Sequence, residues 1–158
     1  MGLMAVSFIS QAQKIAFIEL DSLVSLMPEM IQARKASEDY SKQLQSELAD
    51  MQKELNDKTG LYKNNEKTYT DLVKQTKQKE LQDLNQRIQD FQQQAQADFQ
   101  KKNMELANPI NEKAKKAIEK VAKAKGYKIV LDKHPTGILY SEPSEDIFSF
   151  VKAELGLK

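Results

Sequence analysis

Turn-forming residues almost disappear from this chain between Pro28 and Lys125, and this long stretch limits the possible fold more than any other feature. Apolar residues recur there in steps of three and four, the spacing of a coiled-coil seam. They form three series: Tyr40, Leu44, Leu48, Met51 and Leu55; then Leu81, Leu84, Ile88, Phe91 and Ala95; and, after a phase slip, Phe99, Leu106, Ile110, Ala114, Ala117, Val121 and Ala124. Such narrow stripes cannot enclose a thick globular core, so the stretch forms a rod or a hairpin.

A weak point in the pattern favours the hairpin. Between Asn56 and Asp71 the seam blurs, and poor helix formers gather there. These are Asp57, Gly60, Asn64, Asn65 and Thr70. We therefore predict an antiparallel helical hairpin with its turn between Leu61 and Thr70. Two arms of equal length would place the tip near residue 77, but that region contains no helix breaker.

Both ends of the chain are predicted to build one small body. The segment Lys14–Leu20 (KIAFIEL) is rich in β-branched and aromatic residues and predicts a strand, followed by a short helix before Pro28. Beyond the hairpin, Gly126 ends the second helix, Tyr127–Leu131 predicts a strand, and 138–140 a return strand. Ser144 is predicted to cap a closing helix that carries Ile147, Val151 and Leu155 on one face.

The predicted fold is α+β and mostly α: a long coiled-coil hairpin projecting from a small β-containing body. The body comprises residues 13–28 and 126–158, and the hairpin arm residues 29–125. Apolar residues of the strands are the candidate core of the body or of an oligomer. These are Ile15, Phe17, Ile129, Leu131 and Ile138.

The first twelve residues resemble a signal-peptide remnant. An apolar run from Leu3 to Ile9 precedes Ser10-Gln11-Ala12, which fits signal-peptidase cleavage before Gln13. No Lys or Arg precedes the run, so an ordinary N-terminus is the alternative.

Composition argues against catalysis and against nucleic-acid binding. The 24 basic and 23 acidic side chains give a net charge of +1, whereas a nucleic-acid binder usually carries a clear basic excess. The chain has no Cys, and its only His, His134, cannot form a two-His metal site alone. No Gly-rich phosphate loop is present. We therefore predict a protein that is not an enzyme and that needs no cofactor or metal.

Several segments resemble the Skp/OmpH family of periplasmic chaperones. The matching pieces are KIAFIELDSLVSLMPE, SELADMQKELND, KELQDLNQRIQDFQQQAQADFQKK, GYKIVLD, SEDI and VKAELG. The resemblance extends from Lys14 to Leu157. It implies a homotrimer whose body strands join in a β-barrel and whose hairpins surround a cavity that holds unfolded outer-membrane proteins without ATP. The sequence departs from the family at Pro109 and in its Gln-rich stretch 92–96.

Within that framework we predict three sets of functional residues, each with a plainer alternative. Tyr62, Tyr69, Met104 and Phe99 are candidates for client contact, since Met and Tyr adapt to varied apolar partners; the alternative is that they belong to the seam. A basic collar near the end of the second helix, Lys113, Lys115, Lys116, Lys120 and Lys123, is a candidate for contact with acidic clients or an anionic membrane; the alternative is a solvated face. Pro109 is a candidate arm pivot or a site of simple curvature.

The sequence thus predicts an ATP-independent periplasmic holdase, a chaperone that binds unfolded chains without refolding them. Its partners would be unfolded outer-membrane proteins and its own copies, with no nucleic acid. The alternative is a structural or adaptor coiled coil that binds one specific partner helix.

Overall fold

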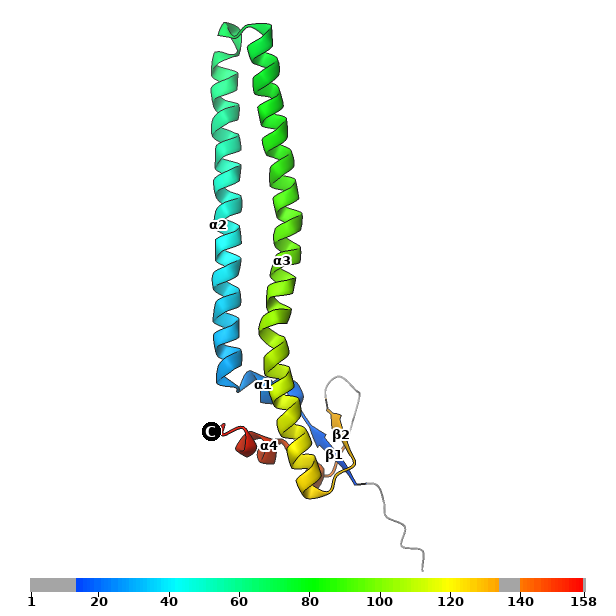
Figure 1. Cartoon of the computed structure of the whole chain (residues 1–158). Helices are drawn as coiled ribbons and strands as arrows, with labels where there is room; N and C mark the ends of the chain where they lie inside the picture. Colours follow the sequence, from blue (N-terminus) through cyan, green and yellow to red (C-terminus); the bar gives the residue numbers. More distant parts are fainter. Residues whose placement is uncertain (1–13, 134–139, 158) are drawn as a thin grey trace, which may run out of the picture. The chain divides into compact units, whose positions relative to one another are not determined.

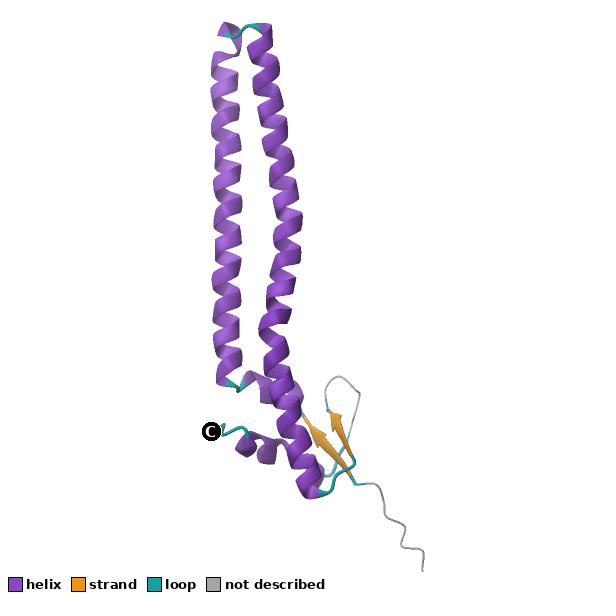
Figure 2. Cartoon of the chain, in the orientation of Figure 1, coloured by secondary structure: helices purple, strands orange, loops and turns teal. Residues whose placement is uncertain are grey.

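The computed structural model describes residues 14–133 and 140–157, and Figure 1 follows the chain through its helices and strands. The elements, in order, are β1 (Ile15–Ile18), α1 (Leu20–Ser25), α2 (Pro28–Asn65), the 3₁₀ turn η1 (Glu66–Thr68), α3 (Asp71–Lys125), β2 (Ile129–Asp132), the 3₁₀ turn η2 (Pro143–Glu145) and α4 (Phe148–Glu154). Figure 2 shows how helix dominates and how small the sheet is. The prediction of a mostly helical α+β chain is confirmed.

The contacts of the chain divide it into two compact units. We call Gln32–Ala107 the arm, and the described residues before and after it the body (14–31, 108–133 and 140–157). Helix α2 begins in the body and continues into the arm, and helix α3 begins in the arm and continues into the body. The boundaries between the two units therefore lie inside helices and not at helix ends. Helix α3 ends at Lys125, which is also the last residue of the hairpin predicted from the sequence.

The arm is a helical hairpin in which α2 and α3 run antiparallel (Figure 1). Its turn lies where the sequence predicted it, since α2 ends at Asn65 and α3 begins at Asp71. Short polar side chains stabilise this turn by bonding to nearby backbone groups, which competes with helix continuation. The Thr68 hydroxyl donates to the Asn65 carbonyl over 2.7 Å, and the Asn65 amide donates to the Leu61 carbonyl over 2.9 Å.

The seam of the arm is only partly buried. Leu84 and Ile88 are buried, whereas the other predicted seam residues of the arm, such as Leu48 and Phe91, are half-buried. In a two-helix arrangement the partner helix covers one side of a side chain, and water reaches the rest. Polar contacts also join the two helices of the arm; for example, the Ser37 hydroxyl donates to Asn103 Oδ1 over 2.5 Å.

The body is organised around β1. Strand β1 pairs in parallel with β2, in a register that places Ile15 opposite Ile129 and Phe17 opposite Leu131. On the other edge of β1, Asp146 forms a bridge with Phe17, whose carbonyl accepts a hydrogen bond from the Ile147 amide over 2.9 Å. Segments from both chain ends therefore meet at one strand, as the sequence predicted.

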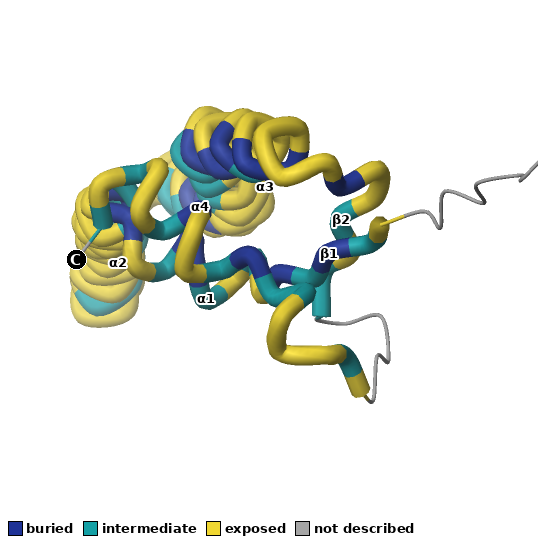
Figure 3. The backbone as a smooth tube through the Cα atoms, turned by 90° about the horizontal axis from the view of Figure 1, so that it is seen from below, coloured by how far each residue is buried: buried dark blue, intermediate teal, exposed yellow. Residues whose placement is uncertain are grey.

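The core of the body lies on one face of β1. Ala16 and Ile18 of β1 are buried there, and the largest fully buried side chains are Leu23, Met27, Ile147 and Val151. Figure 3 shows the buried positions gathered on the inward sides of the body segments. The core thus combines β1, α1, α4 and the last turns of α3.

The strand residues predicted as core lie on the opposite face. Ile15 and Phe17 are half-buried, and Ile129 and Leu131 are 41% and 39% exposed. Within one chain, therefore, Ala16 and Ile18 form the core contact of β1, because successive side chains of a strand point to opposite faces. Ile138 and residue 139 of the predicted return strand lie outside the described residues. Tyr140, the last residue of that predicted strand, is described and lies in no helix or strand.

Two local predictions are wrong. The closing helix begins at Phe148, not after Ser144, because the backbone of Asp146 is engaged with β1; Asp146 Oδ1 then accepts the Phe148 amide over 2.8 Å. Ala124 is exposed, and Ala122 is buried in its place. In the body, α3 packs against a strand and short helices, so coiled-coil spacing no longer predicts which side is covered.

Candidate functional site: the arm tip and the surfaces around it

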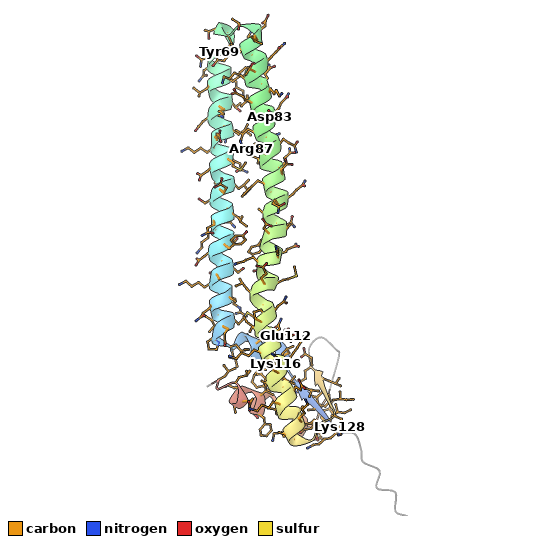
Figure 4. All side chains as sticks on the ribbon, viewed as in Figure 1. Tyr69, Asp83, Arg87, Glu112, Lys116 and Lys128 are labelled. Atoms are coloured by element: carbon orange, nitrogen blue, oxygen red, sulfur yellow. The ribbon has the colours of Figure 1, made fainter. Side chains whose placement is uncertain are left out.

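The tip of the arm brings together two of the four residues predicted to contact clients. Tyr62 lies in the last turns of α2, and Tyr69 in the loop before α3, labelled at the tip in Figure 4. Their ring centroids are 6.2 Å apart, with the ring planes tilted by 39°. This separation is within the range of interacting aromatic pairs. Both residues are half-buried, so part of each remains accessible.

The two tyrosines line a pocket of about 340 Å³. Leu61 and Leu81 complete its apolar walls, and its polar lining comes from Lys58, Asn65, Lys77 and Glu80. Residues of α2, the turn and α3 all contribute, so the pocket exists only because the hairpin closes at this point. Sequence analysis found the tyrosines but missed the pocket, although the apolar Leu61 inside the predicted turn was a signal for it.

Each charged side chain that lines the pocket is held in an ion pair. Lys58 forms an ion pair with Glu54 at 2.8 Å, and Lys77 with Glu80 at 2.9 Å. The hydrogen bonds from these lysines lower the pKa of Glu54 and of Glu80, and the bond to Glu80 raises the pKa of Lys77. In each pair the lysine and the glutamate compensate each other's charge.

The hydroxyl of Tyr62 is also engaged. It accepts a hydrogen bond from Gln78 Nε2 over 2.9 Å and donates to Glu66 Oε1 over 3.4 Å. No hydrogen bond of the Tyr69 hydroxyl is found within the described residues. The pocket therefore offers aromatic and aliphatic walls with one uncommitted hydroxyl.

The other two predicted client residues lie elsewhere in the arm. Phe99 lines a second, more apolar pocket of about 210 Å³ in the seam, together with Leu44, Leu48, Phe91 and Ala95. Met104 is 58% exposed. The structure therefore separates the predicted set into a tip pair, a seam residue and an exposed residue. Leu72 and Val73, at the start of α3, are 74% and 37% exposed, and sequence analysis did not single them out.

Most of the predicted basic collar is neutralised. Lys113 pairs with Glu29, Lys115 with Glu112 at 3.2 Å, Lys120 with Glu154 at 2.5 Å, and Lys123 with Glu119. Hydrogen bonds from their lysine partners lower the pKa of Glu29 and of Glu119. Of the five predicted collar residues, only Lys116, labelled in Figure 4, forms no ion pair with another described residue. Glu29 and Glu154 are distant in sequence from their lysine partners, so these two pairs could not be predicted from residue spacing along α3.

Pro109 lies inside α3, next to the contact boundary at Asn108. Proline has no backbone N–H, so one hydrogen bond of the helix is missing at this point. The helix nevertheless continues on both sides of it, from Asp71 to Lys125.

The described residues contain neither a metal-ligand cluster nor a helix that could cross a membrane. No cluster of three or more metal-ligating side chains is found in them. Among the helices of this part of the chain, none is long and apolar enough to cross a membrane.

The comparison with family models decides which family this sequence represents. The model described as outer membrane protein (OmpH-like) matches residues 14–155, most of the chain. The chain belongs to the OmpH-like family. This confirms the resemblance seen in the sequence, and membership supports a chaperone role for this OmpH-like protein.

A solved structure has the same fold. It is the crystal structure of a protein assigned as an outer membrane chaperone (OmpH-like) from Caulobacter crescentus CB15. The TM-score is 0.77 at 17% sequence identity, and the alignment covers 97% of this chain and 90% of that chain. At this identity the likeness shows the fold alone. No curated protein sequence matches this OmpH-like chain.

Proposed function

We propose that this OmpH-like protein is an ATP-independent holdase of the periplasm that keeps unfolded outer-membrane proteins from aggregating. The observation that carries the proposal is the half-buried state of the arm seam. Residues such as Leu48, Phe91 and Phe99 are covered on one side and accessible on the other. A holdase needs many weak apolar contacts with varied chains, and a long, partly exposed apolar stripe supplies them.

The client-contact residues of the proposal are those that retain accessible apolar surface. Tyr62 and Tyr69 supply it at the tip, Phe99 in the seam pocket, and Met104 on the exposed side of the arm. Aromatic rings and a flexible thioether adapt to different partners at low cost. No single one of these contacts is needed for binding, so the loss of one should weaken it only slightly.

The proposal includes a homotrimer assembled through the exposed face of the sheet. Ile15, Phe17, Ile129 and Leu131 form an apolar face that one chain leaves partly uncovered. Among the described residues, β2 pairs with β1 alone, so its other edge is open to another strand. Proteins rarely leave such an edge exposed, and pairing between copies would cover both the edge and the apolar face.

Attraction to an anionic membrane surface is assigned mainly to Lys116. The other collar residues are each paired with a glutamate, which reduces their net field. Any such attraction should therefore be weak and should disappear at high salt.

Pro109 is the proposed pivot of the arm. Its missing hydrogen bond lies next to the boundary between the two contact units, where bending would disturb the fewest contacts. Pro109→Ala should narrow the distribution of distances between spin labels on the arm and on the body, and reduce the range of client sizes held. Unchanged distributions and an unchanged client range would remove the pivot from the proposal.

The proposed function is tested by solution mass together with a client assay. An unfolded β-barrel membrane protein is diluted from urea into buffer with and without this protein, and light scattering is recorded. We expect a mass of three chains and a soluble client at near-stoichiometric ratio. A monomer or dimer that leaves the client to aggregate would instead support an adaptor coiled coil with one specific partner.

A further inference from the structure

We propose that the pocket at the arm tip binds one aromatic side chain of an unfolded client segment. This inference rests on the proposed function and makes it more specific. It assigns to Tyr62 and Tyr69 a defined site with a preferred class of side chain, in addition to general apolar contact.

The pocket is large enough to hold a single aromatic side chain. Its volume of about 340 Å³ lies at the lower end of the range of ligand pockets. Pocket walls come from the end of α2, the turn and the first turns of α3. A site at the end of a two-helix hairpin can be reached by an extended chain, which needs to insert only one residue.

The electrostatics of the pocket favour an uncharged ligand. A bound anion would need a free cation, but Lys58 and Lys77 are both paired with glutamates. A bound cation would need a free carboxylate, and Glu80 is engaged by Lys77. Replacing either pair by a ligand contact would exchange one ion pair for another and gain little.

The walls favour an aromatic ring over an aliphatic side chain. Tyr62 and Tyr69 are separated by 6.2 Å and tilted by 39°, so a third ring can approach either of them in a tilted or offset arrangement. Leu61 and Leu81 cover the rest of an inserted ring. The uncommitted Tyr69 hydroxyl can bond to the polar group of a Tyr or Trp, which Phe and Leu do not have.

The proposed clients carry such residues in a suitable pattern. Strands of outer-membrane barrels alternate apolar and polar residues and place aromatic residues in girdles at both membrane interfaces. When one aromatic residue occupies the pocket, its neighbours two positions away point to the same side of the extended segment. The exposed Leu72 and Val73 at the start of α3 are available to such neighbours.

The chain contains no Trp, so the fluorescence of a bound Trp can be measured without background. The probes are short, soluble, unstructured peptides that differ only at the central residue, which is Trp, Leu or Lys. Binding of the Trp peptide to the full chain is followed by its emission shift and anisotropy. The Leu and Lys peptides are used as competitors.

We expect a blue shift on binding, and we expect the Leu and Lys peptides to compete with inhibition constants about tenfold larger than the dissociation constant of the Trp peptide. The double variant Tyr62→Ala, Tyr69→Ala should bind the Trp peptide about tenfold less tightly. The matched variant Tyr62→Phe, Tyr69→Phe keeps both rings and should retain most of the binding. Tyr140→Ala, which removes an exposed tyrosine of the body, should bind like the wild type. Far-UV circular dichroism verifies that each variant is folded.

Equal competition by the Leu or Lys peptide would overturn the inference, as would wild-type binding by the double Ala variant. The client assay separates this result from failure of the proposed function. A wild-type protein that keeps the client soluble but does not bind the Trp peptide contradicts only the aromatic site. A wild-type protein that fails to keep the client soluble contradicts the proposed function itself.

Discussion

The body and the arm of this OmpH-like protein bury their apolar residues to very different degrees. The body encloses Leu23, Met27, Ile147 and Val151 completely, using segments from both ends of the chain. The arm, Gln32–Ala107, is more than twice as long as any single body segment but buries only Ala33, Leu84 and Ile88. Several elements surround a body side chain, whereas one partner helix covers a seam side chain.

We infer from this difference that the body mainly provides stability and that the arm mainly provides the proposed binding surface. The body can hold its fold because most of its apolar surface is removed from water. The arm keeps apolar surface accessible, which lowers its own stability and leaves that surface free for the clients proposed above. Four predictions, in order of decreasing effect, test whether the body and the arm differ in this way.

Truncation of a body core residue should have the largest effect. Leu23→Ala removes a fully buried side chain and should lower the free energy of unfolding by about 2–5 kcal/mol. The measurement is urea denaturation at one fixed protein concentration, because association of copies would add to the apparent stability. Leu61→Ala is the control, since Leu61 is 61% exposed and its truncation should change stability by less than about 0.5 kcal/mol. Similar losses in both variants would contradict the comparison.

Truncation of a seam residue should have a smaller and local effect. Ile88→Ala should destabilise the arm by about 2 kcal/mol, at the low end for buried aliphatic residues, because one helix covers the site. Hydrogen exchange should accelerate in the arm while the amides of β1 and β2 keep their rates. Faster exchange in the body strands would show that the two regions unfold as one unit.

Filling the seam pocket should stabilise the arm. Ala95→Leu adds apolar volume to the pocket of about 210 Å³ between Leu48, Phe91 and Phe99, and we expect a gain of about 1 kcal/mol. Gln93→Leu, at an exposed neighbouring position, is the control and should give no gain. If Ala95→Leu also reduced client binding, the pocket would be identified as part of the contact surface. A loss of stability would mean that the seam tolerates no further side chain at this position.

Acidification should have the smallest effect and a definite sign. Hydrogen bonds from Lys77 and Lys58 lower the pKa of Glu80 and of Glu54, so each folded carboxylate holds its proton less tightly than in the unfolded chain. Their contribution to stability is present above the ordinary glutamate pKa of 4.5 and is lost as the pH falls through the lowered value. Both groups are exposed, so the change should be slight. Denaturation midpoints measured from neutral to acidic pH should fall less in Glu80→Gln than in the wild type.

Much of the fold was predictable because its signals are local. Steps of three and four along the chain predict a seam, and the breakers from Asp57 to Thr70 predict the turn that is found at Glu66–Thr68. The two tyrosines of the tip could be singled out because Tyr62 and Tyr69 are adaptable side chains outside the three apolar series of the seam. Gly126 predicted the end of α3, and its φ of 77° is the left-handed conformation that glycine adopts most readily.

The amino-acid sequence by itself determined the helical hairpin, the position of its turn, and the construction of the body from both chain ends. Tertiary structure decided which face of β1 is core, why α4 begins at Phe148, and how the collar lysines are neutralised by Glu29 and Glu154. It also decided that Tyr62 and Tyr69 share one pocket with Leu81. The physical reason is the range of each interaction. Helix periodicity and turn preference act within a few residues, whereas burial, ion pairing and pocket formation depend on residues that only folding brings together.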